Sequence, residues 1–290
     1  MSTAPASLIT VSSRPSLLAR LNALYARHET IRFLVTSDLK SGHRDKVLGN
    51  FWSLLDPLAF AAVYYVVFGV LYGQARGHTG AYLVYLVTGV FAFQFTQGAV
   101  VQAAGCIRGR RGLIHEISFP KAIFPIATCF SRLYDFLWGQ VALLILVLLS
   151  GTALSLHVLW LPVIIFLNLL FAIGLALIVA VLGAFFADTV NVVSIAMRLL
   201  MYFCPLFYYV HDVVGDNGKV IVHGLIPPGA QFYYMLNPLA CFFEAYRDCL
   251  LHARSPDPGL LLYTAVVAAV VLLVGFAVFT RSEGHFAKYI

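Results

Sequence analysis

Residues 81–107 contain no charged side chain, and this run limits the possible folds more than any other feature of the chain. A helix needs about 20 consecutive apolar residues to cross a bilayer core, so the run is long enough to span a membrane. Comparable apolar runs cover residues 51–72, 122–155, 154–187 and 259–280. Because the bilayer core offers no water, the backbone there must hydrogen-bond to itself as helix. The sequence therefore predicts an all-α polytopic membrane protein.

The composition excludes several other classes of protein. Of the 290 residues, 61% are hydrophobic and only 11% are charged. Soluble domains carry about 25% charged residues, so no large soluble domain is expected. The net charge of +6 comes from basic residues that flank the apolar runs, which is typical of membrane topology rather than of nucleic-acid binding. The five cysteines form no CxxC pair and no zinc-type cluster, so the sequence predicts no metal site.

The positions of the charges predict the topology. Six spanning helices are expected near residues 51–73, 81–106, 122–151, 158–187, 190–211 and 259–280. If the N-terminus is cytoplasmic, most lysines and arginines fall on the inner side of the membrane. Basic residues favour that side, so both termini are predicted to be cytoplasmic.

Residues 220–243 also lack formal charge, but prolines interrupt them at Pro227–Pro228 and at Pro238. Proline removes a backbone donor and clashes with the preceding turn, so neither half is long enough to span. We expect two short re-entrant helices that dip into the membrane from outside and form an exit gate, since irregular backbone survives there only inside protein or beside a wet cavity. A structured outer loop is the alternative.

The N-terminal region is expected to have two parts before the transmembrane domain of residues 49–290. Residues 1–13 are rich in Ser, Thr and Ala and are predicted to be a disordered tail. Residues 14–48 are predicted to be a cytoplasmic amphipathic helix on the membrane surface. Its apolar stripe recurs at three- and four-residue spacing and includes Leu17, Leu21, Leu24 and Ile31.

Four segments resemble a known family in order and spacing. Residues 38–69 read DLKSGHRDKVLGNFWSLLDPLAFAAVYYVVFG, and residues 112–125 hold a Leu-Ile pair followed by Ser-Phe-Pro-Lys and Pro125. Phe186-Ala187-Asp188 and the region from Phe203 to Arg247, with its Asn237-Pro238 pair, complete the set. Together they resemble the ABC-2-type permeases that export bacterial polysaccharides. The chain departs from that pattern at three places. Asp56 replaces the usual asparagine, a common lysine is replaced near Glu116, and Ala187 replaces the usual arginine.

The resemblance implies the transmembrane subunit of an exporter for a lipid-linked O-antigen, capsule or teichoic-acid polysaccharide in the bacterial inner membrane. The chain has no G-x-x-x-x-G-K-[ST] phosphate loop, so it is not expected to hydrolyse ATP itself. In the family, two permease copies pair with two copies of a separate ATPase chain, which would bind the ATP and Mg.

The resemblance also implies roles for individual residues. The loop 107–120 would couple the permease to the ATPase; its charged residues are Arg108, Arg110, Arg111, His115 and Glu116. A loop that only sets topology is the alternative. Aromatic rings can pack on the apolar faces of sugars, so the polymer path would include Phe203, Phe207, Tyr208, Tyr209, Phe232, Tyr233 and Tyr234; plain helix packing is the alternative for these.

Two intramembrane arginines call for separate interpretation. Arg132 and Asp135 are three residues apart on one helix and are expected to neutralise each other. Arg198 has no partner at helical spacing, and a buried ionisable residue is by default a functional candidate. We expect it either to lie on the substrate path, where it could contact a lipid-linked pyrophosphate, or to extend to the inner surface.

Two other functions remain open from the sequence. An ABC-2 permease for a drug or small lipid would share the fold. An integral-membrane glycosyltransferase would need an acidic base or metal ligand beside the bilayer, and outer acids such as Asp212 and Asp216 leave that class open.

Overall fold

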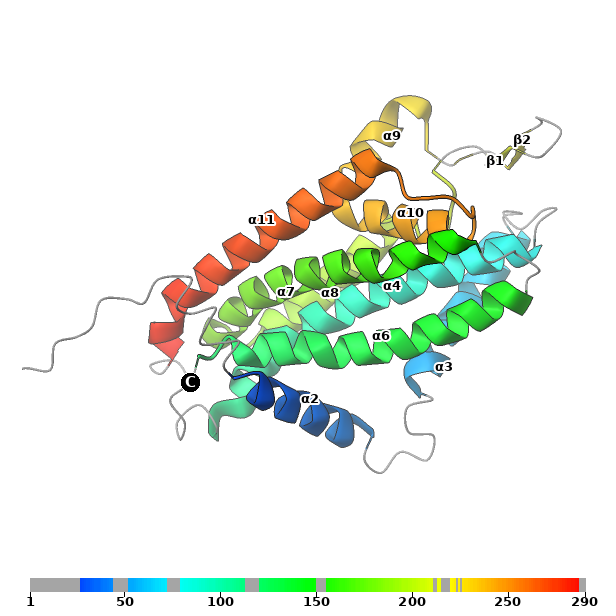
Figure 1. Cartoon of the computed structure of the whole chain (residues 1–290). Helices are drawn as coiled ribbons and strands as arrows, with labels where there is room; N and C mark the ends of the chain where they lie inside the picture. Colours follow the sequence, from blue (N-terminus) through cyan, green and yellow to red (C-terminus); the bar gives the residue numbers. More distant parts are fainter. Residues whose placement is uncertain are drawn as a thin grey trace, which may run out of the picture.

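The computed structural model describes residues 27–43, 52–71, 79–112, 120–149, 155–210, 213–214, 220–222, 224 and 226–286. Within these residues the chain is a bundle of helices with one small hairpin (Figure 1). The elements are α2 (His28–His43), α3 (Trp52–Tyr64) with a π-helical extension (Tyr65–Leu71), α4 (Thr79–Cys106), α6 (Ile123–Leu149), α7 (Leu161–Phe185), α8 (Thr189–Phe203), β1 (Val213–Val214), β2 (Val220–Val222), α9 (Pro228–Met235), α10 (Pro238–Leu250) and α11 (Pro258–Ser282). Short 3-10 turns lie at Arg108–Arg110, Leu156–Trp160 and Glu283–His285.

Four segments of the described chain are long and apolar enough to cross a membrane. They are Gly80–Cys106, Ile123–Leu149, Leu156–Phe185 and Pro258–His285. These four match the predicted second, third, fourth and sixth spans to within a few residues. The predicted first and fifth spans correspond to shorter apolar helices, Leu58–Leu71 and Thr189–Phe203.

The fifth predicted span, residues 190–211, is wrong at its outer end. Helix α8 stops at Phe203, and Cys204 adopts an extended conformation with φ −90° and ψ 146°. The cause is Pro205, because proline disfavours the helical conformation for the residue before it. The fifteen residues of α8 rise only about 22 Å, less than the roughly 30 Å of a bilayer core.

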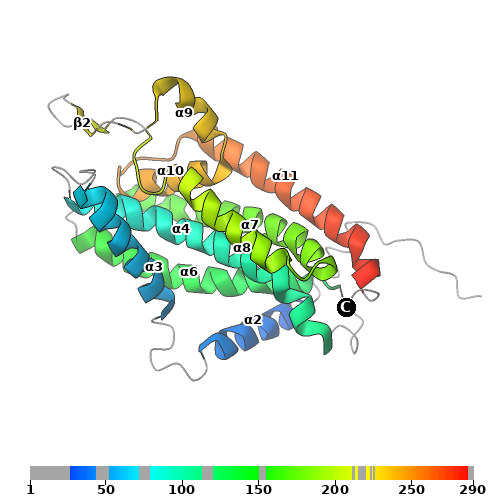
Figure 2. The same ribbon diagram turned by 180° about the vertical axis from the view of Figure 1, so that it is seen from behind.

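Helix α4 lies at the centre of the bundle and packs against α3, α6, α7, α8 and α10 (Figures 1 and 2). Two close crossings depend on glycine. A Cβ atom at Gly183 of α7 would lie 1.7 Å from the carbonyl oxygen of Ala104 on α4, and one at Gly275 of α11 would lie 2.3 Å from the carbonyl oxygen of Gly174 on α7. Small residues at such crossings let membrane helices approach closely enough for their backbones to touch.

The two ends of the bundle differ. Helix α2, the C-terminal ends of α4, α7 and α11, and the N-terminal ends of α6 and α8 gather at one end, which we call the α2 end (Figure 1). Helices α9 and α10 and the hairpin lie at the opposite end, which we call the α9 end. Both ends of the described chain, at α2 and after α11, are therefore at the α2 end.

Helix α2 packs against α6, with Leu34 buried and Ile31 and Val35 half-buried against the core. The opposite side of α2 is exposed at Phe33 and Lys40. The structure is helical over residues 28–43 of the predicted segment 14–48. Leu17, Leu21 and Leu24 of the predicted apolar stripe lie outside the described residues.

The region predicted as the outer gate is only partly helical. Residues 220–222 form β2, which pairs antiparallel with β1, so the expectation of helix there is wrong. Two short helices do follow and break where predicted, at the Asn237-Pro238 pair. The side chain of Asn237 accepts a hydrogen bond from the Leu239 amide and so caps α10. Helix α10 continues to Leu250 and is almost entirely buried, so it belongs to the core of the bundle.

Candidate functional site

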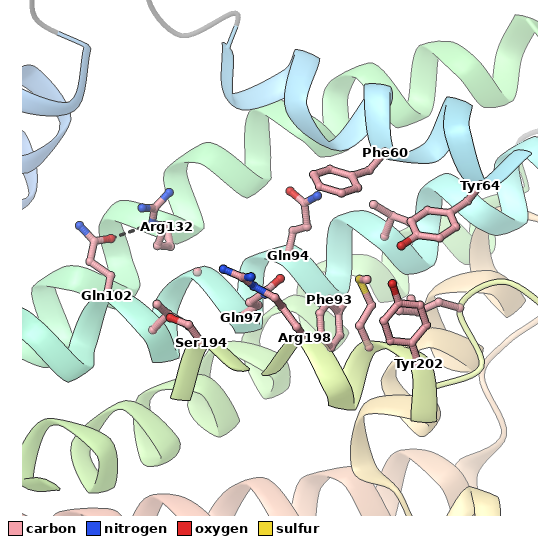
Figure 3. Close-up of a pocket in the computed structure, with 15 residues that line it drawn as sticks. Phe60, Tyr64, Phe93, Gln94, Gln97, Gln102, Arg132, Ser194, Arg198 and Tyr202 are labelled. Carbon is pink, nitrogen blue, oxygen red and sulfur yellow. Dashed lines mark hydrogen bonds between the residues drawn. The ribbon is translucent and has the colours of Figure 1, made fainter. Parts of the chain in front are cut away.

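A cleft of about 690 Å³ opens between α3, α4, α6 and α8. It is polar toward the α2 end and aromatic toward the α9 end (Figure 3). Its lining includes Phe60 and Tyr64 of α3, Phe93, Gln94, Gln97 and Gln102 of α4, Arg132 of α6, and Ser194, Arg198, Met201 and Tyr202 of α8. Helices α4 and α6 are candidate membrane spans, and α8 is one of the shorter apolar helices. The other shorter apolar helix, Leu58–Leu71, includes the C-terminal half of α3. The polar side chains thus sit within the apolar part of the bundle.

Helical periodicity gathers the polar groups. Gln94, Gln97 and Gln102 of α4 line the same cleft because residues three and eight positions apart on a helix share one face. Ser194 and Arg198 of α8 face the same space one turn apart. In Figure 3, Gln97 lies beside Arg198, whereas Gln102 is directed to Arg132.

The two arginines of the cleft are held differently. Arg132 donates from Nε to the Gln102 Oε1 at 2.7 Å, and its Nη1 lies 3.6 Å from Asp135 Oδ2. The predicted neutralisation of Arg132 by Asp135 is therefore confirmed. Arg198 is exposed in the cleft and has no hydrogen bond or ion pair to any of the residues that the structure describes.

Aromatic rings close the cleft toward the α9 end. Phe207 stacks on Tyr64 with ring centroids 3.9 Å apart and on Phe68 at 5.3 Å. The ring centroid of Tyr202 lies 6.3 Å from that of Phe207, so Tyr202 belongs to the same cluster. Phe207 was predicted to lie on the polymer path; the structure places it at the closed end of this cleft, almost fully buried.

Tyr208 and Tyr209 are packed inside the protein. The Tyr82 hydroxyl donates to the carbonyl oxygen of Phe207 at 2.6 Å, and the Tyr85 hydroxyl donates to that of Tyr208 at 2.7 Å. Tyr209 lies against Tyr85 with ring centroids 4.3 Å apart. The Tyr208 hydroxyl is hydrogen-bonded to the hydroxyl of Tyr234 on α9, so these two predicted path residues do meet.

The remaining predicted path residues point outward. Phe203, Phe232 and Tyr233 are each about 70% exposed. Phe232 and Tyr233 pack on each other with ring centroids 5.8 Å apart, but they line no part of the cleft. The aromatic residues predicted from sequence thus fall into three sets, at the cleft, inside the packed α9 end and on the outer surface of the chain.

A second arginine site lies near the α9 end, and we call it the Arg247 clamp. Arg247 of α10 is fully buried and donates from Nη1 to Glu244 at 2.8 Å and from Nη2 to the carbonyl oxygens of Pro205 and Leu206 at 2.9 and 3.3 Å. Its guanidinium lies 3.4 Å from the centre of the Tyr85 ring. The clamp fixes the non-helical residues after α8 against α4 and α10.

The predicted coupling residues are largely engaged within the chain. Arg108 donates to the carbonyl oxygens of Ala184 and Phe185 and so satisfies the C-terminal end of α7. Arg110 binds Asp38 of α2 at 2.6 Å and lies over the Phe124 ring. Arg111 is exposed. His115 and Glu116 lie outside the described residues.

The glutamines of the cleft and Tyr202 were not predicted from the sequence. Gln94, Gln97 and Gln102 carry no charge, so they did not interrupt the apolar run, although three amides on one face of a spanning helix would have indicated a polar lining. Tyr202 lies one turn after Arg198 and could have been found by the same spacing. Among the described residues no cluster of three His, Cys, Asp or Glu side chains could hold a metal ion, and all five cysteines are buried and free.

Comparison with known proteins identifies relatives over most of the chain. The sequence model of the family described as ABC-2 type transporter matches residues 29–251. The chain is 24% identical over 258 residues to the O-antigen export system permease protein RfbA of Klebsiella pneumoniae, which covers 88% of this chain and 92% of the relative. It is 23% identical over 274 residues to the protein of the same name from Myxococcus xanthus, covering 94% of this chain and all of the relative.

Proposed function

The chain belongs to the ABC-2 type transporter family, and we propose that it is the permease subunit of an exporter for a lipid-linked polysaccharide of the O-antigen, capsule or teichoic-acid type. It would move this cargo from the cytoplasmic to the outer side of the bacterial inner membrane. The observation that carries the proposal is the similarity, over 88% of this chain or more, to permeases of O-antigen export. A cleft that joins polar groups to aromatic rings is consistent with a cargo that is both hydroxyl-rich and bulky.

The energy would come from a separate ATPase chain that binds ATP and Mg, present in two copies. We place its docking surface at the α2 end, which would then be cytoplasmic together with both termini. Arg111 is exposed there and can pair with carboxylates of a partner. Arg108 and Arg110 would act indirectly, because they tie the segment after α4 to α7 and to α2.

A second copy of the chain would face the cleft. The outer surfaces of α3 and α8 expose large apolar residues, among them Val63 on α3 and Ile195 and Leu199 on α8. A cleft with two arginines between such helices is costly to expose to lipid. In a homodimer built through α3 and α8, the two clefts would instead face each other and enclose a path. The short helix α9 would lie at its outer mouth.

The test is a deletion of this permease in the bacterium that carries it, with detection of the polysaccharide both at the cell surface and inside. We expect the surface polymer to disappear while the lipid-linked polymer accumulates on the cytoplasmic side, since synthesis continues without export. Expression of the intact chain in the deletion strain is the control and should restore the surface polymer. If the polymer is absent from both locations, the chain belongs to synthesis, as a glycosyltransferase would, and the proposal fails.

A further inference from the structure

The cleft carries positive charge without a matching negative charge. Among the described residues that line it, the charged ones are Arg132 and Arg198. The charge of Arg132 is offset by Asp135, which lies 3.6 Å away, whereas Arg198 has no partner among the residues that the structure describes. An unpaired guanidinium in the apolar part of a membrane protein is costly and is retained where an anion or a polar ligand meets it.

The hydrogen-bonding capacity around Arg198 is also unused. Gln94 and Gln97 face the cleft beside it, and neither side chain has a hydrogen bond to another described residue. Each amide offers two donors and one acceptor oxygen, which suits the hydroxyl groups of a sugar. Gln102 differs, because it accepts the Nε–H of Arg132 and so orients that guanidinium.

The cleft changes character along the bundle. From Gln102 to Gln94 it runs about 12 Å along α4, from the α2 end toward the middle of the helix. Tyr202 then follows Arg198 by one helical turn, and Tyr64 lines the same end, stacked on Phe207. A ligand seated along the cleft would thus meet Arg132 with Gln102 first, Arg198 with its neighbouring amides next and the rings of Tyr64 and Tyr202 last (Figure 3).

We propose that this cleft binds the phosphate-linked first sugar of the lipid-linked cargo, a proposal that rests on the function proposed above. Arg198 binds the phosphate oxygens, with Arg132 as the second, pre-oriented cation. Gln94 and Gln97 bind sugar hydroxyls, and Tyr64 and Tyr202 pack on the sugar ring. Guanidinium groups suit this task because their donors match two phosphate oxygens at once.

Three features favour a glycosyl phosphate over an ordinary phospholipid headgroup. The amides lie next to the cation, where a sugar joined to the phosphate would place its hydroxyls. The aromatic rings lie beyond the amides, where the ring of that sugar would continue. No Asp or Glu is among the described residues that line the cleft, so its described lining carries positive charge.

The experiment measures binding to the full permease–ATPase complex in lipid nanodiscs. The probe is a radiolabelled disaccharide joined through pyrophosphate to a short polyprenyl chain. We expect Arg198→Gln to weaken its binding about tenfold or more, because a charge-assisted contact is lost. The affinity of Arg198→Lys for the probe should lie between those of the wild type and Arg198→Gln, since lysine keeps the charge but cannot bind two phosphate oxygens in the bidentate geometry of a guanidinium. Arg281→Gln, an exposed arginine at the end of α11, is the matched control and should bind as the wild type does.

A second variant tests the proposal independently, in case Arg198→Gln does not fold. Gln97→Glu is nearly isosteric and places a carboxylate in the cleft beside Arg198, which competes with the phosphate. We expect it to weaken binding at least as much as Arg198→Gln while the complex still elutes as an intact assembly with its ATPase. If the probe does not bind the wild type, or binds both variants as tightly as the wild type, the proposal is overturned.

Competition identifies the source of the phosphate. We expect the polyprenyl phosphate without sugar to displace the probe less well than the glycosylated compound, and phosphatidylglycerol not to displace it at equal concentration. Displacement by phosphatidylglycerol as efficient as by the glycosylated compound would overturn the proposal in favour of a site for bilayer lipid. A wild-type chain that restores surface polymer, together with variants that bind normally, would refute this site and leave the export function standing.

Discussion

Arg247 and Arg198 are both arginines on helices of the bundle, yet their surroundings are opposite. Arg247 is fully buried, pairs with Glu244, donates to the carbonyl oxygens of Pro205 and Leu206 and lies over the Tyr85 ring. Arg198 faces an open cleft and has no hydrogen-bond partner among the described residues. A buried charge is tolerated when its hydrogen bonds are satisfied inside the protein. The contrast therefore separates an arginine that stabilises the fold from one that is available to a ligand.

The same contrast holds for the aromatic residues around the two arginines. At the Arg247 clamp, Tyr82 and Tyr85 use their hydroxyls to hold the backbone at Phe207 and Tyr208. In the cleft, Tyr64 and Tyr202 present ring surface to the open space. Phe207 belongs to both regions, because it stacks on Tyr64 while its carbonyl oxygen accepts the hydrogen bond from Tyr82. A substitution in the Arg247 clamp would thus be expected to move Phe207 and so alter the closed end of the cleft.

The largest effect is expected from Arg247→Met. The substitution keeps most of the side-chain length but leaves Glu244 and the carbonyl oxygens of Pro205 and Leu206 without their donor. Removing one partner of a buried ion pair costs about 3–5 kcal/mol, so we expect a much lower melting temperature or loss of the folded complex. Thermal unfolding in detergent measures the melting temperature, and size-exclusion chromatography then shows whether the folded complex remains.

The double variant Arg247→Met with Glu244→Gln is the control for this result. It removes the unpaired carboxylate, so it should recover part of the lost stability. A single variant as stable as the wild type would contradict the view that Arg247 holds the residues after α8.

An intermediate effect is expected from Gly89→Ala. A Cβ atom at Gly89 of α4 would lie 2.9 Å from both Arg247 Nη2 and Leu206 Cδ2, so the clamp must shift to admit it. Forcing a methyl group into a well-packed site costs about 1–3 kcal/mol, and we expect a measurable fall in melting temperature.

Gly105→Ala on the same helix is the matched control for Gly89→Ala. Its Cβ would meet only Val190 Cγ2, at an ordinary distance of 3.6 Å. Equal melting temperatures for the two alanine variants would show that the clamp is not tightly packed.

The smallest effect on stability is expected from Arg198→Leu. The side chain makes no hydrogen bond to the described residues, so its loss should change the free energy of unfolding by about 0.5 kcal/mol or less. Export of polymer should nevertheless fall, and the pair of measurements distinguishes a ligand contact from a structural one. A loss of stability like that of Arg247→Met would remove the distinction between the two arginines.

The resemblance to ABC-2 permeases, drawn from four motifs, is confirmed by the family match over residues 29–251. Most helices were also predictable, because long apolar runs in a bilayer have only helical solutions. The C-terminal end of α8 was not predicted, although Pro205 follows it closely, because an apolar run extends past this break to Val210. The hairpin of β1 and β2 was not predicted either, since two- and three-residue strands give too little periodic pattern to recognise.

The candidate site was predictable only in part. Arg198 was singled out from the sequence because it interrupts an apolar segment without a partner at helical spacing. The three glutamines were not, because an uncharged amide hardly alters an apolar run. The roles of Tyr208 and Tyr209 were also beyond the sequence, since aromatic residues after a helix can line a path or pack inward with equal local patterns.

The sequence by itself determined that the chain crosses a membrane repeatedly, the limits of its four long apolar helices within a few residues, and which family it resembles. These properties follow from local hydrophobicity, proline positions and motif order. Only the tertiary structure decided which arginine is enclosed and which is open, because α4 and the residues after α8 enclose Arg247 of α10, while α3 and α8 leave a cleft beside Arg198. The environment of a charge depends on helices distant in the sequence, and periodicity along one helix carries no information about them.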